Sequence, residues 1–188
     1  YERVLRGHRE IIGTRASHTV DIKFRRGDGV VIDCAVTSKV VYAEDGRIVG
    51  FSGTIQDITE RKLAEKQLEA LAYYDPLTGL ANRALFTRQL EDVLSDAGRS
   101  AHTSALLLLD LDRFKEVNDS RGHSSGDELL VKVGNAVSRL LDSQHFLARL
   151  GGDEFAVIVR GATDCAAIED LARRIIAAIS GAMHLEHG

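Results

Sequence analysis

The chain has 188 residues, enough for one large domain or two small ones. Its formal net charge of −4 argues against a general attraction to nucleic acid or to an anionic membrane surface. No apolar run reaches the roughly 18 residues that a membrane span needs. Two isolated cysteines and the lack of a secretory pattern at the N-terminus predict a cytoplasmic protein.

Residues 19–57 alternate between apolar and polar side chains, which is the pattern of strands with one buried face. Val20, Ile22 and Phe24 point one way, and the charged residues between them point the other. Glycine-containing turns separate three such runs, so we predict three antiparallel strands. The runs are residues 20–25, 30–42 and 49–55. Tyr1 to Gly13 is expected to form a helix before them.

A helix is predicted from residue 58 to residue 74, with Asp57 or Thr59 as its N-cap. Its apolar residues form only a narrow stripe, too short to indicate a coiled coil by itself. Pro76 ends the segment, since the residue before a proline avoids helical geometry. Two interpretations remain open: a signalling helix that pairs with its copy, or a simple helical spacer.

The second half of the chain alternates helical and strand patterns. Asn82 is the predicted cap of a helix, residues 96–103 form a loop, and the apolar run Ser104–Asp110 is expected to be a strand buried on both faces. Helices are predicted over residues 127–141 and 166–180, with two short strands, 146–150 and 155–159, between them. This order favours an α/β sandwich with helices over one sheet.

Gly151 and Gly152 join the two short strands and predict a β-hairpin whose tip carries Asp153 and Glu154. Asp110 ends another apolar strand. Carboxylates at the ends of neighbouring strands can converge on one divalent cation of the Mg²⁺ type. For an arbitrary Gly-Gly-Asp-Glu, a solvated turn is the simpler interpretation.

The surrounding motifs favour a cation site over a solvated turn. In order and spacing they resemble the GGDEF family of diguanylate cyclases, from about residue 72 to the end. They are Asp75-Pro76-Leu77-Thr78-Gly79-Leu80-Ala81-Asn82-Arg83, Asp110-Leu111-Asp112-Arg113-Phe114-Lys115-Glu116-Val117-Asn118-Asp119, Gly122-His123, Gly126-Asp127-Glu128-Leu129-Leu130 and Arg149-Leu150-Gly151-Gly152-Asp153-Glu154-Phe155. The resemblance implies a ferredoxin-like, nucleotidyl cyclase-like α/β sandwich in an α+β protein.

The resemblance also implies a reaction: two GTP molecules, one on each subunit of a homodimer, are joined into cyclic di-GMP with release of pyrophosphate. By the family pattern, Asp110, Asp153 and the Leu111 carbonyl hold Mg²⁺, with Mn²⁺ as an alternative. Asp153 and Glu154 are the implied catalytic residues. Whether Glu154 acts as a metal ligand or as a general base stays open.

For GTP, the resemblance assigns Asn118 and Asp127 to the guanine edge. A carboxylate accepts hydrogen bonds from N1–H and the exocyclic amine, and would be left unpaired by adenine. The triphosphate is assigned to Lys115 and to the Phe114 amide. Gly151 and Gly152 let the main chain approach the phosphates. His123 matches the motif and is included among the substrate-binding residues.

Residues 1–57 resemble the C-terminal part of a PAS sensor domain, so we expect a sensor-like part, a linker helix over residues 58–74 and a GGDEF domain over residues 75–188. The family's inhibitory Arg-x-x-Asp is replaced by Asp142-Ser143-Gln144-His145. The family domain normally continues past Gly188, so this stretch alone is expected to be inactive or nearly so. An alternative role is a GTP-binding module that regulates a downstream phosphodiesterase domain.

Overall fold

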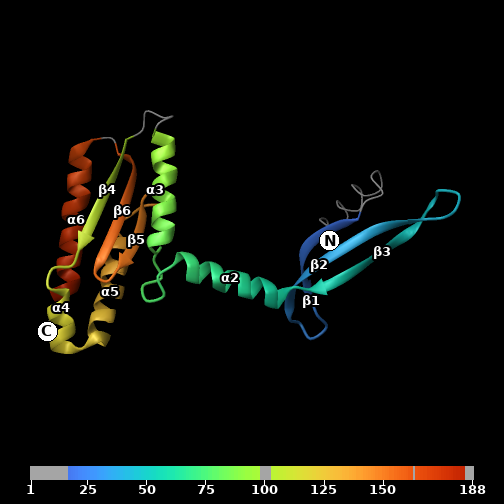
Figure 1. Cartoon of the computed structure of the whole chain (residues 1–188), viewed down its shortest axis with the longest axis horizontal. Helices are drawn as coiled ribbons and strands as arrows, with labels where there is room; N and C mark the ends of the chain where they lie inside the picture. Colours follow the sequence, from blue (N-terminus) through green and yellow to red (C-terminus); the bar gives the residue numbers. More distant parts are fainter. Residues whose placement is uncertain (1–16, 98–102, 163, 185–188) are drawn as a thin grey trace. The chain divides into compact units, whose positions relative to one another are not determined.

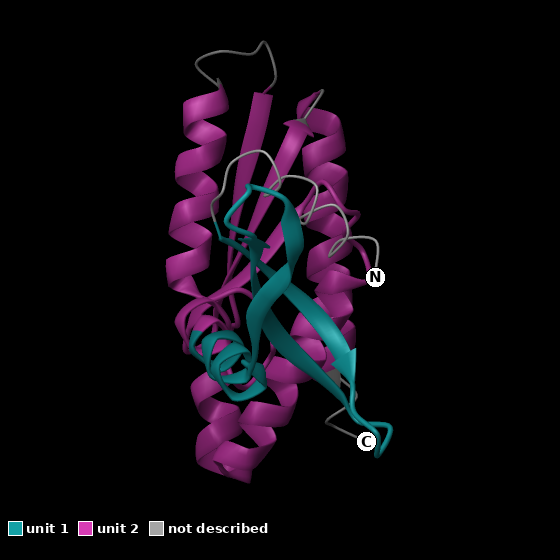
Figure 2. Ribbon diagram, turned by 90° about the vertical axis from the view of Figure 1, so that its right-hand side faces the viewer, with its two compact units in different colours: residues 1–68 teal, residues 69–188 magenta. Residues whose placement is uncertain are grey.

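The computed structural model describes residues 17–97, 103–162 and 164–184. They divide into two compact units, residues 1–68 and residues 69–188 (Figure 2). The helix predicted over Tyr1–Gly13 and the middle of the loop predicted over residues 96–103 lie outside the described ranges. Among the described helices, none combines the length and the apolar character needed to cross a membrane.

The first unit contains a three-stranded antiparallel sheet, as predicted, in the order β1-β2-β3 (Figure 1). Its strands are β1 (His18–Arg25), β2 (Val31–Tyr42) and β3 (Ile48–Asp57). The register pairs Val20 with Val36 and Val40 with Phe51. Cys34 and Ser38 of β2 are buried, whereas Phe24, Phe51 and Ile55 are exposed. The described residues therefore leave much of this sheet's apolar surface uncovered.

The predicted linker helix is present as α2 (Thr59–Tyr73). Of the two candidate caps, Asp57 provides the bond: its Oδ1 accepts from the Thr59 backbone N–H at 2.9 Å. The Thr59 hydroxyl instead accepts from the Asp33 backbone N–H at 3.0 Å, which ties the start of α2 to β2. No residue of α2 is buried, and Leu68 and Leu71 of its apolar stripe are exposed. The choice between a pairing helix and a spacer stays a prediction.

The second unit is built on an antiparallel sheet in the order β4-β6-β5 (Figure 1). Its strands are β4 (Thr103–Asp110), β5 (Phe146–Gly151) and β6 (Glu154–Ala162). One face carries α3 (Arg83–Ala97); the other carries α5 (His123–Ser138) and α6 (Cys165–His184). The predicted α/β sandwich is confirmed. Asn82 caps α3 as predicted, since its Oδ1 accepts from the Ala84 and Leu85 backbone N–H groups at 2.9 and 3.1 Å.

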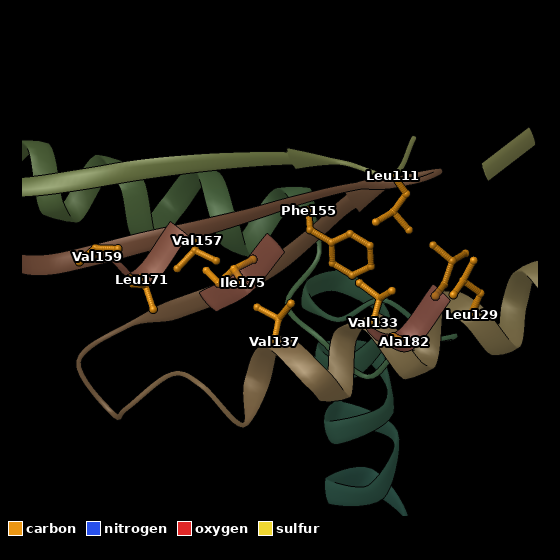
Figure 3. Packing of buried hydrophobic residues seen from close by; sticks show 11 residues of the cluster. Leu111, Leu129, Val133, Val137, Phe155, Val157, Val159, Leu171, Ile175 and Ala182 are labelled. Carbon is orange, nitrogen blue, oxygen red and sulfur yellow. The ribbon is translucent and has the colours of Figure 1, made fainter. Parts of the chain in front are cut away.

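Strand β6 divides the core of this unit by its alternation. Phe155, Val157 and Val159 face α5 and α6, where Val133, Val137 and Ile175 are fully buried (Figure 3). The intervening Ala156 and Ile158 face α3 and pack in the cluster that contains Phe86 and Val93. Because β6 is the central strand and is covered on both faces, it fixes the position of the hairpin that precedes it.

Strand β4 corrects one expectation. We predicted that both of its faces would be buried, but Leu106 and Leu108 are 42% and 68% exposed. The other face is covered, because Leu107 and Leu109 pack against the α5–α6 core. In the described sheet β4 is an edge strand with β6 as its one neighbour. A continuous apolar run cannot distinguish a strand covered on two faces from an edge strand covered on one.

A short helix, α4 (Phe114–Arg121), was not predicted. It begins after Arg113, a non-glycine residue with φ of 61°, in the left-handed region. Gly122, with φ of 85°, separates α4 from α5. The helix predicted over residues 127–141 therefore starts earlier, at His123, and ends earlier, at Ser138.

Candidate functional site

The acidic residues gather at the edge where β4 ends and β6 begins. The register pairs Asp110 of β4 with Glu154 of β6 directly across the ladder, and both side chains are exposed. Directly paired residues present their side chains on the same face of a sheet, with Cβ atoms about 5 Å apart. Asp153 comes immediately before Glu154, in the turn. Two strands that are distant in sequence thus bring carboxylates to one edge.

The hairpin turn depends on its two glycines. Gly151 has φ of 136° and Gly152 has φ of 55°, conformations that residues with a Cβ rarely adopt. A Cβ added at either position would have no atom within 4 Å, so the turn is open on its outer side. The turn therefore offers bare backbone next to Asp153 and Glu154, which a bulky ligand can approach.

A cavity of about 290 Å³ lies beside this edge. Its lining comprises two acidic residues, an arginine and apolar residues of β4, β5 and β6: Arg83, Leu108, Leu109, Asp110, Leu150, Glu154 and Phe155. Charged and apolar residues thus line one cavity beside the acidic edge.

Arg83, the first residue of α3, has a role at the acidic edge that was not predicted from the sequence. Its Nη2 lies 3.0 Å from Glu154 Oε2, and its Nε donates to the Leu150 carbonyl oxygen at 3.1 Å. Both members of the ion pair are largely exposed. Arg83 thus offsets part of the negative charge of the edge and holds the last residues of β5. No sequence signal revealed this, because the pair joins residues 71 positions apart.

The donor chemistry of the edge fits a hard divalent cation. The described residues contain no group of three or more His, Cys, Asp or Glu side chains arranged to hold a metal ion. A Mg²⁺ ion, however, takes only one or two carboxylates and completes its shell with water and substrate phosphates. The paired Asp110 and Glu154 provide two such carboxylates. That Asp110, Asp153 and the Leu111 carbonyl share one ion stays a prediction.

The predicted guanine-reading residues lie on neighbouring helices, Asn118 on α4 and Asp127 at the second turn of α5. Gly126, for which no role was predicted from the sequence, is where α4 packs closely against α5. A Cβ atom at the buried Gly126 would overlap the side-chain oxygen of Asn118. The same Cβ would lie 2.9 Å from Asn118 Cγ and 3.2 Å from Phe114 Cζ. The absence of a side chain there lets the Asn118 amide pack against α5 at Gly126, the residue before Asp127 in the sequence.

The residues predicted to contact the triphosphate are mostly exposed. Lys115 on α4 and His123 at the start of α5 are both exposed. The Phe114 backbone N–H donates to the Leu111 carbonyl oxygen at 3.2 Å, and the Phe114 ring packs against the main core. That long hydrogen bond uses both the amide assigned to phosphate and the carbonyl assigned to the metal. Contacts of these residues with GTP stay predictions.

Arg149 of β5 forms a second ion pair next to the hairpin, more buried than that of Arg83 and not predicted from the sequence. Its Nη1 lies 3.0 Å from both carboxylate oxygens of Asp75, while Nε and Nη2 donate to the Gly152 carbonyl oxygen at 3.0 and 2.7 Å. Asp75 Oδ1 also accepts from the Thr78 hydroxyl and backbone N–H. Burial raises the pKa of Asp75, but the bonds from Thr78 and Arg149 outweigh it and the pKa is lowered.

In the segment that lacks the family's Arg-x-x-Asp, Asp142 Oδ1 lies 2.6 Å from His145 Nδ1. The Gln144 backbone N–H also donates to this oxygen at 2.8 Å. That backbone bond contributes most to a lowered pKa of Asp142, with His145 adding to it. The two positions are therefore occupied by side chains that bond each other, with no guanidinium at residue 142.

Comparison with known proteins gives a consistent result. The family described as "Diguanylate cyclase, GGDEF domain" matches residues 72–187, more than half of the chain. The chain is 43% identical over 138 residues to the probable diguanylate cyclase DgcE of Escherichia coli K12. This alignment covers 72% of this chain but only 12% of DgcE. It is 39% identical over 140 residues to the cyclic di-GMP phosphodiesterase PdeB of Shewanella oneidensis, covering 74% of this chain and 16% of PdeB.

Among solved structures, the coiled coil and GGDEF domain of DgcB from Caulobacter crescentus, in complex with c-di-GMP, superposes with a TM-score of 0.59 at 30% identity. The match covers 63% of this chain and 61% of that chain. The chain thus spans only a small part of its curated relatives, and the family model matches the unit that holds the acidic edge. The family match and the shared fold show that this chain belongs to the GGDEF family.

Proposed function

We propose that the GGDEF unit of this chain is the catalytic part of a diguanylate cyclase that condenses two GTP molecules into cyclic di-GMP and releases pyrophosphate. The observation that carries the proposal is the register of β4 and β6, which pairs Asp110 with Glu154 beside an open glycine turn. In a GGDEF chain, such an edge can neutralise the charge that builds up when a phosphoryl group is transferred.

In this proposal, Asp110, Asp153 and the Leu111 carbonyl hold Mg²⁺, with Mn²⁺ as an alternative. When bound, the ion supplies charge neutralisation at the phosphate oxygens and at the departing pyrophosphate. Glu154 is either a further ligand or the base that accepts the proton of the attacking 3′-hydroxyl. Arg83 forms an ion pair with Glu154. Before Glu154 can fill either role, Arg83 has to release its carboxylate or share it with the metal ion or the hydroxyl.

The nucleotide is assigned to the helices beside the edge. Asn118, held against Gly126, and the exposed Asp127 recognise the guanine edge. Lys115, His123 and the Phe114 amide contact the triphosphate, and the bare backbone of Gly151 and Gly152 lies along the phosphates. The 3′-hydroxyl of one GTP attacks the α-phosphate of the other, so catalysis needs a homodimer. The catalytic work of these residues is mainly positioning.

The whole protein is proposed to act in the cytoplasm, with residues 1–57 as the C-terminal part of a PAS-like sensor and α2 as the linker. The uncovered apolar stripe of α2 supports a pairing role for this helix, because Leu68 and Leu71 are among the exposed leucines. A second copy of α2 would cover that stripe in the proposed homodimer.

The direct test is to incubate the full-length protein with GTP and Mg²⁺ and to follow pyrophosphate and cyclic di-GMP together. We expect both products in a 2:1 ratio, and loss of both in Glu154→Gln. Because Glu154 is exposed, this variant should keep its fold, which circular dichroism verifies. A folded wild-type protein that binds GTP but forms neither product would contradict the proposal.

Guanine recognition has its own test. Asp127→Ala should weaken GTP binding by about 1.5–3 kcal/mol, roughly 10- to 150-fold, because hydrogen bonds to a charged acceptor are lost. Glu128→Ala, the neighbouring exposed carboxylate on α5, is the matched control and should leave affinity close to wild type. Affinities are measured by calorimetric titration with a non-hydrolysable GTP analogue. Unchanged affinity in Asp127→Ala would remove this residue from the guanine site.

A second candidate function is favoured by one observation: PdeB, a relative of similar identity to this chain, is named a cyclic di-GMP phosphodiesterase. The unit would then bind GTP and regulate a phosphodiesterase domain elsewhere in the same protein. The two candidates differ in the assay above, since a regulatory module binds GTP without forming cyclic di-GMP and changes phosphodiesterase activity when GTP is added.

A further inference from the structure

Arg149 contacts two parts of the molecule that are far apart in sequence. One edge of its guanidinium holds Asp75, and the other donates twice to the carbonyl oxygen of Gly152. Its side chain is only 11% exposed, and that of Asp75 is 16% exposed. The guanidinium is planar and has five N–H donors, so it can make both sets of bonds at once, whereas a lysine ammonium cannot.

The Gly152 carbonyl belongs to the peptide unit that continues into Asp153. Since a peptide unit is planar, fixing this oxygen also fixes the direction in which the backbone enters Asp153. The pairing of Gly151 with Glu154 closes the hairpin, but it does not reach the Gly152 carbonyl. Gly151 and Gly152 have wide conformational freedom, and no atom lies within 4 Å of where their Cβ atoms would be. Among the described contacts, the two bonds from Arg149 are those that hold the Gly152 carbonyl.

Arg149 is itself anchored. Its backbone N–H donates to the Ala81 carbonyl at 2.9 Å, and Asp75 is fixed by the Thr78 hydroxyl at 2.6 Å. Asp75 follows the end of α2 by two residues, and Asn82 Nδ2 donates to the Ala72 carbonyl in the last turn of α2. The connection between α2 and α3 therefore forms a rigid support for the guanidinium.

We propose that Arg149, anchored by Asp75, is a positioning residue that sets the orientation of the Gly152–Asp153 peptide and through it the placement of Asp153 and Glu154. The inference rests on the proposed cyclase activity for its catalytic consequence, but its structural consequence is independent of that activity. Arg149 contacts neither GTP nor metal in this proposal; it acts through the backbone of the turn.

The test compares Arg149→Lys and Asp75→Asn with wild type in the full-length protein. Arg160→Lys is the matched control, because Arg160 also bonds a side chain of another element, Gln89 at 2.6 Å, but at the far end of β6. Hydrogen–deuterium exchange is followed for residues 151–155 and, as a fold check, for α5. The kcat and KM for GTP are measured on the same samples.

In Arg149→Lys we expect exchange at residues 151–155 to accelerate at least tenfold while α5 keeps wild-type protection. A displacement of about 1 Å in a reacting group can cost about 100-fold in rate, so kcat should fall 10- to 100-fold. KM should stay within about threefold, since the guanine site is untouched. Asp75→Asn removes the counter-charge of the buried guanidinium, so it should loosen residues 151–155 and also lower the protection of α5, and Arg160→Lys should do neither.

Wild-type exchange at residues 151–155 together with wild-type kcat in Arg149→Lys would overturn the inference. So would faster exchange spread equally over the turn and α5 in that variant, because that pattern marks a role in general stability. If the wild-type protein forms no cyclic di-GMP but Arg149→Lys still loosens residues 151–155 selectively, the proposed function fails and the positioning role stands.

Discussion

Two arginine–carboxylate pairs hold the acidic hairpin, and both have the same N–O distance of 3.0 Å. Arg149 and Asp75 are 11% and 16% exposed, whereas Arg83 and Glu154 are 64% and 52% exposed. Distance alone would rank the pairs as equal. Burial separates them, because water and salt screen the exposed pair and hardly reach the buried one. The buried pair is suited to rigid support, and the exposed pair can exchange its partner for another cation.

The largest expected effect tests this contrast through stability. Asp75→Ala leaves the buried guanidinium of Arg149 without a counter-charge, which should lower the free energy of unfolding of the GGDEF unit by about 3 kcal/mol. Glu154→Ala, which breaks the exposed pair, should cost less than about 1 kcal/mol. Native-state hydrogen exchange of α5 and β6 measures both values in the same unit.

A double variant checks the cause of the loss. In Asp75→Ala combined with Arg149→Met the orphaned charge is gone, so part of the lost stability should return. Equal costs for Asp75→Ala and Glu154→Ala would show that burial does not distinguish the pairs. A double variant as unstable as the sum of its single changes would show that Asp75 acts without Arg149.

Acid should affect the buried pair in a defined direction. Although burial raises the pKa of Asp75, the bonds from Thr78 and Arg149 outweigh it and hold the pKa below the usual value of an aspartate. A group whose pKa is lower in the folded state contributes stability above its unfolded pKa, and that contribution is lost as pH falls through the folded pKa. The contribution of Asp75 should therefore be complete near pH 5 and decline below about pH 4.

The comparison is between wild type and Asp75→Asn, which keeps the shape of the side chain but cannot titrate. Melting temperatures at pH 5, 4 and 3 should fall more steeply for wild type, so that the two proteins become more similar as the pH drops. Parallel curves would mean that other carboxylates account for the acid sensitivity of the unit, and that the ion pair contributes little.

The contrast between the pairs also shows where sequence reasoning succeeds. The hairpin, the Asn82 cap and the arrival of carboxylates from two strand ends at one edge were predicted, because local patterns and strand ends determine them. The pair that the sequence favoured was Asp110 with Asp153, whereas the register places Asp110 opposite Glu154. Neither ion pair was predicted, because their partners are 71 and 74 residues apart and meet only after the sheet and α3 are assembled. The sequence supplies the residues, but tertiary packing decides which guanidinium meets which carboxylate.

Two other discrepancies have the same origin. Helix α4 was missed because its eight residues, Phe114–Arg121, are mostly polar, and Phe114 and Val117 are too few to establish an apolar period. Strand β4 was expected to be buried on both faces because Leu106 and Leu108 belong to a continuous apolar run. Whether a strand lies at an edge depends on its neighbours in space, which its own sequence does not encode.

The smallest expected effect concerns the exposed pair and metal binding. Arg83 and a divalent cation compete for Glu154, because both are attracted to the same carboxylate. Arg83→Gln removes the competitor, so Mn²⁺ should bind more tightly in the absence of nucleotide. An exposed ion pair contributes about 0.2–1 kcal/mol, which corresponds to a gain of about 1.4- to 5-fold in affinity. Isothermal calorimetry of the nucleotide-free full-length protein measures this gain.

Arg88→Gln is the matched control, since it removes the same charge from an exposed position on the same helix. Both variants lose one positive charge, which by itself raises the affinity for Mn²⁺. Only the additional gain in Mn²⁺ affinity in Arg83→Gln over Arg88→Gln therefore reports direct competition at Glu154. The gain should also shrink as salt is raised, because screening weakens the exposed pair in wild type first. Equal gains in the two variants, or weaker Mn²⁺ binding in Arg83→Gln, would mean that Arg83 supports the acidic edge instead of competing with the cation. Glu154 would then keep its arginine when metal binds, and the two pairs would both be structural.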